Sequence, residues 1–278
     1  MTDFHAAIYG LVQGLTEFLP VSSSAHLRIV PALLGWEDAG AAYTAIIQWG
    51  TLLAALIYFR KDIFTILFGK AGEKDENGAG RHLLVPIIIG TIPIAVVGLL
   101  LKKHIENEFR SLYFIGINMI LFAIILGLAE RRAKAQRTID SVTNKDGLIV
   151  GLAQMCSLMP GASRSGTTIT GALFIGLERS TAARFSFLLG LPAIFAAGLK
   201  ELIDGMRDAK GTTITPYAHS ALHARPLIIA SVVAFVVGWI SIDWLLKFLK
   251  KNPTYVFIAY RIIAGLAIIA LVKAGTIH

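Results

Sequence analysis

Three ionisable side chains stand inside long apolar stretches of the sequence, with no loop nearby to explain them. They are Glu17, Arg164 and Arg261. A charge at membrane depth costs about 2.5–3.5 kcal/mol even on the gentler insertion scales, so each residue is a candidate for binding or chemistry. Two structural alternatives stay open. Glu17 and Arg164 could simply pair with each other, and Arg261, early in the last apolar stretch, could snorkel to the membrane surface.

The segment around Glu17 holds the side chains of a hydrolytic site. Gln13 and Glu17 are four residues apart and therefore share one face of a helix. Pro20 ends that helix because it has no backbone N–H. Ser22-Ser23-Ser24 then stand at the start of a second helix, with His26 in its first turn. A lone serine there usually only caps the helix, but this group supplies a metal ligand, a nucleophile and a proton acceptor together.

A second polar segment has the composition of an anion-binding loop. It reads Pro160-Gly161-Ala162-Ser163-Arg164-Ser165-Gly166-Thr167-Thr168 and precedes the apolar run 169–176. The free N–H groups and the dipole of a helix start bind anions, and the planar fork of arginine matches phosphate oxygens. We therefore expect phosphate to bind between the two segments. The predicted binding residues are Gln13, Ser22, Ser24, Ser163, Ser165, Gly166, Thr167 and Thr168.

The composition indicates that these two polar segments belong to a membrane protein. The chain is 55% apolar and only 16% charged, whereas a soluble domain has about 25% charged residues. Its net charge of +8 lies mainly between the apolar runs. Such charges anchor a membrane protein and contact anionic headgroups, so we predict no nucleic-acid partner. Five runs approach the roughly 20 residues that cross a bilayer as a helix. They are 43–59, 83–101, 112–129, 227–246 and 256–272.

The first half of the sequence returns in the second half at an offset of about 140 residues. The matched tracts keep their order and spacing, and internal repeats of membrane proteins usually place the binding site at their interface. The pairs are Gly10-Leu11-Val12-Gln13 with Gly151-Leu152-Ala153-Gln154, Pro20 and Ser22-Ser23-Ser24 with Pro160 and Ser163-Arg164-Ser165, and Gly35-Trp36-Glu37 with Gly176-Leu177-Glu178.

The two broken segments predict an inverted-topology repeat in one all-α polytopic membrane domain. Residues 6–36 and 148–177 are long enough to span but are interrupted midway. Broken backbone is tolerated in a membrane only inside protein or beside water, so we interpret each segment as a re-entrant helical hairpin. Three transmembrane helices follow each hairpin and invert the second half. These spans are about 42–60, 83–102 and 112–130 in the first repeat (1–140), and 184–204, 226–247 and 254–273 in the second (147–278).

The distribution of lysine and arginine predicts the orientation. One side receives the loops 60–82, 130–147, 178–184 and 247–253, which hold fifteen of these residues against eight on the other side. Because cytoplasmic loops carry the excess, we expect the first side to be cytoplasmic. Both termini and the opening of the first hairpin then face outward.

At these motifs the sequence resembles the bacterial undecaprenyl-diphosphate phosphatase family, also known as bacitracin-resistance proteins. The resemblance covers essentially the whole chain. It departs from the family pattern at Gln13, where the family also has glutamate, and at Ala25, where glycine is usual. The first departure leaves Glu17 as the only carboxylate of its motif. The carrying motifs are Gln13-Gly14-Leu15-Thr16-Glu17-Phe18-Leu19-Pro20-Val21-Ser22-Ser23-Ser24-Ala25-His26 and Pro160-Gly161-Ala162-Ser163-Arg164-Ser165-Gly166.

The resemblance implies hydrolysis of the lipid undecaprenyl diphosphate to undecaprenyl phosphate with the help of a divalent cation. It also implies a bacterial inner membrane, carrier recycling for cell-wall synthesis, and bacitracin resistance. The lysine and arginine count predicts that the site opens to the periplasmic side. In the mechanism we expect, Glu17 holds Mg²⁺ or Ca²⁺, Arg164 and the amides of 165–168 stabilise the transferred phosphoryl group, Ser23 attacks phosphorus, and His26 handles the proton. The sequence leaves open whether Ser22, Ser24 or water attacks in place of Ser23. It also leaves open whether the protein forms a homodimer.

Two other classes of function fit parts of this pattern. Inverted repeats with broken helices also build transporters, and an anion carrier or lipid flippase would use Arg164 and the serines for binding alone. A purely structural membrane subunit would leave Glu17 and Arg164 without a purpose. Release of phosphate from a prenyl diphosphate by pure protein, with and without a chelator, distinguishes the three.

Overall fold

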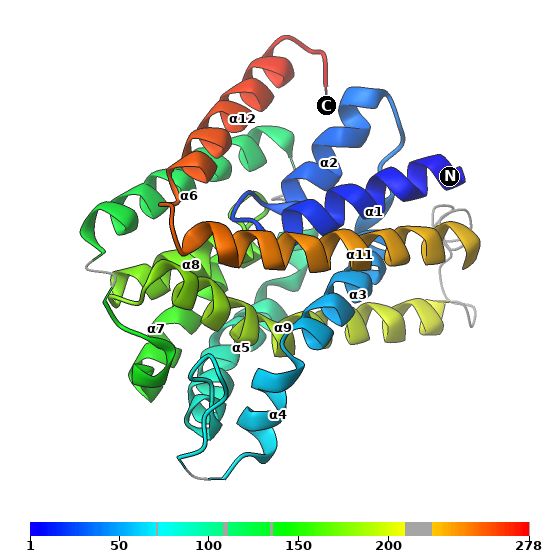
Figure 1. Ribbon diagram of the computed structural model, residues 1–278. Helices are drawn as coiled ribbons and strands as arrows, with labels where there is room; N and C mark the ends of the chain where they lie inside the picture. Colours follow the sequence, from blue (N-terminus) through cyan, green and yellow to red (C-terminus); the bar gives the residue numbers. More distant parts are fainter. Residues whose placement is uncertain (71, 108–110, 134–135, 209–223, 278) are drawn as a thin grey trace.

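The computed structural model describes residues 1–70, 72–107, 111–133, 136–208 and 224–277, and within them all regular structure is helical apart from two isolated β-bridges (Figure 1). The helices are α1 (Asp3–Phe18), α2 (Ser23–Leu34), α3 (Gly40–Tyr58), α4 (Arg60–Phe68), α5 (Leu84–Asn107), α6 (Leu112–Arg132), α7 (Asn144–Met155), α8 (Arg164–Phe174), α9 (Arg179–Asp208), α11 (Ala224–Leu249) and α12 (Tyr255–Lys273). Short 3₁₀ turns lie at Arg81–Leu83, Ile139–Ser141 and Cys156–Leu158.

Five of the described helices are long and apolar enough to cross a membrane, and the chain is a multi-pass membrane protein. Part of α3, Tyr43–Tyr58, is a sixth and shorter apolar segment. Their outer faces are apolar: Leu100 and Ile263 are 74% and 68% exposed. A soluble fold would bury such side chains, whereas lipid solvates them. The five spans are Arg81–Leu100, Leu112–Arg132, Arg179–Lys200, Arg225–Leu249 and Tyr255–Lys273.

The first broken segment turns back on itself. α1 ends at Phe18, residues 19–22 form the turn, and α2 packs against α1. The two ends of the segment lie together, because the His5 and Trp36 rings stack at 4.0 Å and the Tyr9 hydroxyl donates to the Glu37 carbonyl oxygen at 3.3 Å. The break therefore reverses the chain instead of merely kinking one helix.

The second broken segment, α7 and α8, is closed at its base by an ion pair between a half-buried arginine and a buried carboxylate. Arg137 donates to the Asp146 carboxylate at 2.7 Å, at the start of α7, and to the Ile175 carbonyl oxygen at 3.0 Å, just after α8. Burial alone would raise the pKa of Asp146, but hydrogen bonds from Arg137 and Thr143 outweigh it and lower that pKa. The guanidinium thus holds the two ends of the segment side by side.

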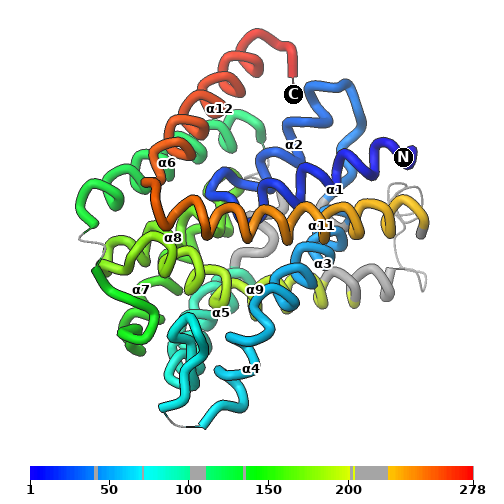
Figure 2. Tube along the Cα trace, viewed as in Figure 1, coloured from blue at the N-terminus to red at the C-terminus, as the bar shows by residue number. Residues whose placement is uncertain are grey.

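Each of the two turned-back segments lies along a long helix of the other half. Figure 2 shows α1 (blue) running along α11 (orange), and α7 packs in the same way on α5. Glycines permit the approach: a Cβ on Gly10 would lie 2.3 Å from the Ala230 carbonyl oxygen, and one on Gly151 would lie 2.3 Å from that of Gly90. Backbone-to-backbone packing of this kind is how helices associate where lipid removes the hydrophobic driving force.

We predict that Gly151→Ala lowers the melting temperature of the detergent-solubilised protein. The new methyl group collides with the Gly90 backbone, and overpacking of this kind costs about 1–3 kcal/mol. Gly127→Ala is the matched control, because its Cβ would meet Ile258 at an ordinary 3.8 Å. There the better helix propensity of alanine, worth about 1 kcal/mol, should preserve or raise stability. Equal melting temperatures for the two variants would contradict the packing described.

Candidate active site

Four of the predicted site residues meet where the two broken segments touch. Glu17, near the end of α1, accepts a hydrogen bond through Oε2 from Ser23 Oγ at 2.8 Å and from Gln13 Nε2 at 2.9 Å. Its Oε1 forms an ion pair with Arg164 Nη2, from the first residue of α8. Glu17 is only 5% exposed. A carboxylate, a hydroxyl, an amide and a guanidinium thus form one connected polar cluster.

Two strained serines begin the helices that return from the breaks. Among the described residues other than glycine, only Ser22 and Ser163 have positive φ angles, 78° and 71°. They are the N-caps of α2 and α8, and such a conformation costs on the order of 1–3 kcal/mol. Each pairs with the serine two residues later, with Oγ–Oγ distances of 3.1 Å to Ser24 and 3.2 Å to Ser165. The strained turns set the directions in which Ser23 and Arg164 project.

Arg261 of α12 binds the backbone of both breaks. It is fully buried and donates to the carbonyl oxygens of Gly161 and Ala162 at 3.0 and 2.8 Å in the second break, and to that of Pro20 at 3.4 Å in the first. It also donates to the Met119 carbonyl oxygen at 3.2 Å. The side chain therefore does not snorkel to the surface, which was the alternative left open above. It satisfies carbonyl groups that the breaks release from helical bonding.

The predicted phosphate loop uses most of its polar groups internally. Ser163 Oγ accepts from the Gly166 N–H at 3.2 Å, so that amide is already capped. The hydroxyls of Thr167 and Thr168 both donate to the Arg164 carbonyl oxygen, at 3.0 and 2.7 Å. These groups stabilise the start of α8, and what projects from it toward Glu17 is the Arg164 side chain.

Two further contacts explain why this loop has no room to spare. Ser165 Oγ donates to the Leu19 carbonyl oxygen at 2.9 Å and so joins α8 to the first break. A Cβ on Gly166 would lie 2.7 Å from Arg261 Nη1. A side chain at this position would therefore press against the buried guanidinium.

His26 lies one turn beyond Ser23 on α2, and both of its ring nitrogens have partners. Nδ1 is 2.7 Å from the Ser22 carbonyl oxygen, and Nε2 is 2.6 Å from the Tyr260 hydroxyl. A carbonyl oxygen only accepts, so we assign the hydrogen to Nδ1, and Nε2 then accepts from Tyr260. To serve Ser23 as a base, His26 would have to release Tyr260.

Buried oxygen and amide atoms around the cluster lack a protein partner. They are Gln13 Oε1 and both amide atoms of Gln154 of α7. A Cβ on Gly190 would lie within 4 Å of both Gln154 Oε1 and Arg164 Nε. Such atoms normally bind water or a ligand. Oxygens of Glu17, Gln13 and Ser23 make an all-oxygen donor set with one carboxylate. Such ligands suit Mg²⁺ or Ca²⁺, which complete their coordination shells with substrate phosphate and water. Within the described ranges, no group of three or more His, Cys, Asp or Glu side chains could hold a metal ion.

The structure adds residues that the sequence analysis did not select. Tyr260 and Thr51, which hydrogen-bond to His26 and Gln13, sit in apolar spans where one hydroxyl is an ordinary occurrence. Gln154 carried a signal, since it is the repeat counterpart of Gln13. The repeat alone assigned that glutamine no role in the site.

Known proteins resemble this chain over its whole length. Residues 6–267 match the family described as "Bacitracin resistance protein BacA". Proteins named undecaprenyl-diphosphatase from Pelodictyon phaeoclathratiforme and Chloroherpeton thalassium are each 48% identical to it, over 289 and 291 residues that cover 100% of this chain and at least 99% of each relative. The one from Myxococcus xanthus is 46% identical and covers 99% of this chain and 91% of its own. The chain therefore belongs to the BacA bacitracin-resistance protein family.

Proposed function

We propose that this protein hydrolyses undecaprenyl diphosphate to undecaprenyl phosphate and inorganic phosphate in the bacterial inner membrane. The observation that carries the proposal is the buried contact of Ser23 and Arg164 with one carboxylate, Glu17. It unites a nucleophile, its orienting group and a phosphate ligand, as phosphoryl transfer requires. The name of the full-length relatives, undecaprenyl-diphosphatase, indicates the identity of the substrate. Hydrolysis of the diphosphate recycles the carrier lipid for cell-wall synthesis.

The contacts of Ser23 and Arg164 suggest their roles. Ser23 Oγ donates its hydrogen to Glu17 Oε2, so Glu17 orients the hydroxyl and is within reach of its proton. The oxygen attacks the terminal phosphorus, the bond to the bridging oxygen breaks, and undecaprenyl phosphate leaves. Water then cleaves the phosphoserine and releases phosphate. Arg164 contacts Glu17 through Nη2 alone, which leaves the rest of its fork for phosphate oxygens.

The nucleophile and the proton acceptor each have an alternative that experiments can distinguish. Water oriented by Glu17 can attack phosphorus directly and gives the same products. His26, once released from Tyr260, can take the proton instead of Glu17. A bound Mg²⁺ or Ca²⁺ would be held by Glu17 with Gln13 Oε1 and Ser23, and it would neutralise charge on the diphosphate.

We also propose that the chain is an inverted-topology repeat whose two turned-back segments are re-entrant hairpins. Features at matched positions support this. Gln13 and Gln154 are both fully buried, Ser22 and Ser163 are both strained, and a left-handed glycine follows each hairpin, at Gly35 and Gly176. The helix pairs α1–α11 and α7–α5 correspond in the same way. In this arrangement the site opens to the periplasmic side and both termini lie outside, as the lysine and arginine distribution predicts.

A transporter built on the same repeat is the less favoured function. Binding alone has no need for a hydroxyl held by a carboxylate. The full-length relatives from Pelodictyon phaeoclathratiforme and Chloroherpeton thalassium are named as a hydrolase, undecaprenyl-diphosphatase.

Glu17→Gln should nearly abolish phosphate release from a prenyl diphosphate by the purified protein, and a chelator should do the same to the unchanged protein. The substitution removes the anion that orients Ser23 and binds the cation. Glu37→Gln, at an exposed carboxylate of the same half, should remain active. If Glu17→Gln retains more than about a tenth of the rate, a loss below 1.4 kcal/mol, the role assigned to Glu17 is wrong.

Ser23→Ala should lose far more activity than Ser24→Ala, by at least about a hundredfold. Of the two serines, Ser23 is the one hydrogen-bonded to Glu17, whereas Ser24 is exposed and bonded to Ser22. Initial rates and trapping of a phosphoserine measure the effect. Retention of activity by Ser23→Ala would favour water as the nucleophile.

Cysteine labelling tests the orientation in a Cys156→Ser background with an impermeant thiol reagent on intact cells. Cysteines replacing Ala39 and Ala274 should react from outside. Those replacing Asn77 and Ser141 should react only after the membrane is opened, because they follow an odd number of proposed crossings. The reverse pattern would place the site opening on the cytoplasmic side.

A further inference from the structure

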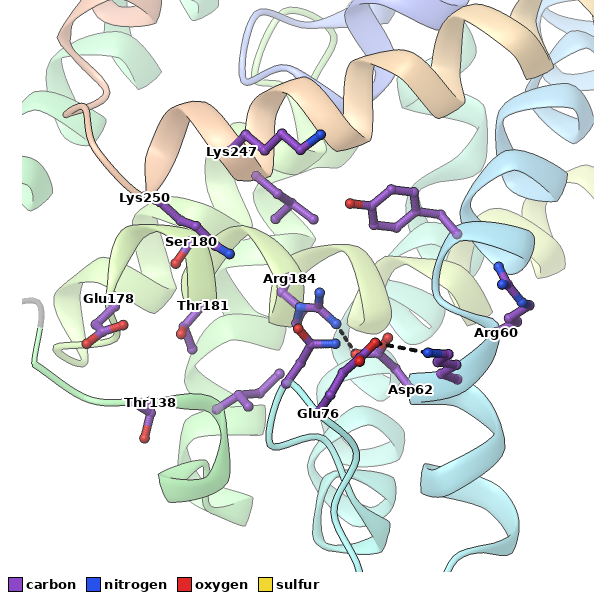
Figure 3. A pocket seen from close by; sticks show the side chains of 15 residues that line it. Arg60, Asp62, Glu76, Thr138, Glu178, Ser180, Thr181, Arg184, Lys247 and Lys250 are labelled. Atoms are coloured by element: carbon purple, nitrogen blue, oxygen red, sulfur yellow. Dashed lines mark hydrogen bonds and ion pairs between the residues drawn. The ribbon is translucent and has the colours of Figure 1, made fainter.

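A polar cavity lies away from the Glu17 cluster, at one end of the long helices. Figure 3 shows it between the end of α3, the start of α9 and the end of α11. Its volume is about 510 Å³, and none of its lining residues belongs to the cluster around Glu17. The cavity is large enough for a phosphate group with its substituents, and the proposed hydrolysis makes no use of it.

The cavity has a positive balance after its internal ion pairs are formed. Lys61 pairs with Glu76 at 3.1 Å, and Arg184 pairs with the buried Asp62. Of the other charged lining residues, Glu178 is the one anion, and the cations are Arg60, Lys247 and Lys250. Lys247 is shared with Asp243, which lies outside the lining, at 2.7 Å. The lining therefore carries a net charge of +2, from five cations and three anions.

Several hydrogen-bond donors of this lining are not used by the described parts of the protein. Lys250 makes no ion pair there, and Arg60 donates to the Ile57 carbonyl oxygen through Nη1 alone. The Ser180 and Thr181 side chains lie in the first turn of α9, a 30-residue helix whose opening N–H groups have no helical acceptor. In Figure 3, Lys250 and Ser180 are drawn at one side of the cavity and Arg60 at the other.

The surface beside the cavity is apolar. Leu56 and Ile57 of α3 are 39% and 41% exposed, and Trp239 and Ile240 of α11 are 44% and 56% exposed. The Tyr58 ring packs edge-on against Trp239 with centroids 6.1 Å apart, and Tyr58 lines the cavity. An amphipathic molecule could thus place a charged head in the cavity and an apolar chain along these helices.

We propose that this cavity is a second anion site, which binds a phosphate group through Lys250 and the start of α9, while Arg60 adds to the positive charge of the lining. The phosphate can come from the headgroup of an anionic phospholipid or from free inorganic phosphate. Basic pockets between membrane helices recognise phospholipid headgroups by this chemistry, and a helix start adds directed N–H groups. The site is separate from the proposed hydrolysis, because it shares no residue with the Glu17 cluster.

The test compares the unchanged protein with two double variants of equal charge change. Arg60→Gln with Lys250→Gln removes the free cations of the cavity. Lys70→Gln with Lys251→Gln removes two exposed cations that do not line it. Native mass spectrometry measures retention of phosphatidylglycerol against phosphatidylcholine. Thermal shift measures stabilisation by inorganic phosphate against chloride at equal ionic strength. Lys250→Gln alone guards against misfolding, because this exposed side chain makes no ion pair or hydrogen bond with the described residues that the change could remove.

The cavity double variant should weaken binding of one of the two probes at least about tenfold, with the control double variant and phosphatase activity unchanged. Selective loss of phosphatidylglycerol supports the site and assigns it to a lipid headgroup. Selective loss of phosphate stabilisation, with lipid retention unchanged, supports the site and assigns it to free phosphate. Equal losses in both double variants would reduce the effect to net charge and overturn the proposal. So would normal binding of both probes by the cavity variant.

Discussion

A protein that breaks two helices in an apolar interior must supply hydrogen-bond partners for the carbonyl groups that the breaks release. Arg261 meets this requirement for both breaks. Its buried guanidinium binds Gly161 and Ala162 in one and Pro20 in the other. Burying such a cation costs several kcal/mol, and charge-assisted hydrogen bonds to carbonyl oxygens offset that cost. The same side chain thereby fixes the distance between the loops, and Glu17 can meet Arg164.

The polar cluster depends on strain as well as on this buried cation. Ser22 and Ser163 adopt left-handed conformations that side chains other than glycine rarely take. Surrounding contacts hold them there, among them the serine pairs and the bond from Ser165 to the Leu19 carbonyl oxygen. Strain of this kind persists only where neighbouring structure over-determines it. It presents Ser23 to a carboxylate that is already paired with Arg164.

Charges elsewhere in the molecule serve two different purposes. Buried carboxylates join helices: Glu130 of α6 accepts from the half-buried Arg179 of α9 at 2.6 Å and from the Thr254 hydroxyl, just before α12, at 2.8 Å. Removing one partner of such a pair would leave an uncompensated buried charge. By contrast, Arg60 and Lys250, which line a cavity, have donors that make no hydrogen bond within the described part of the chain. The pairs stabilise the helix bundle, and the spare donors are free to recognise a ligand.

The sequence by itself determined the membrane class, the two broken segments and the family. It also singled out Gln13, Glu17, Ser23 and Arg164. Composition and motifs are local properties of the chain, so they are visible without the tertiary structure. It did not determine how His26 is used, since its Tyr260 partner is 234 residues away. Nor did it resolve Arg261, whose choice between lipid surface and buried carbonyls depends on which loops surround it. The buried amide group of Gln154, which has no partner among the described residues, and the cavity at the start of α9 likewise arise only when distant helices pack. Tertiary structure decided these points because hydrogen-bond satisfaction depends on neighbours in space, and sequence spacing specifies neighbours only within a helix turn or two.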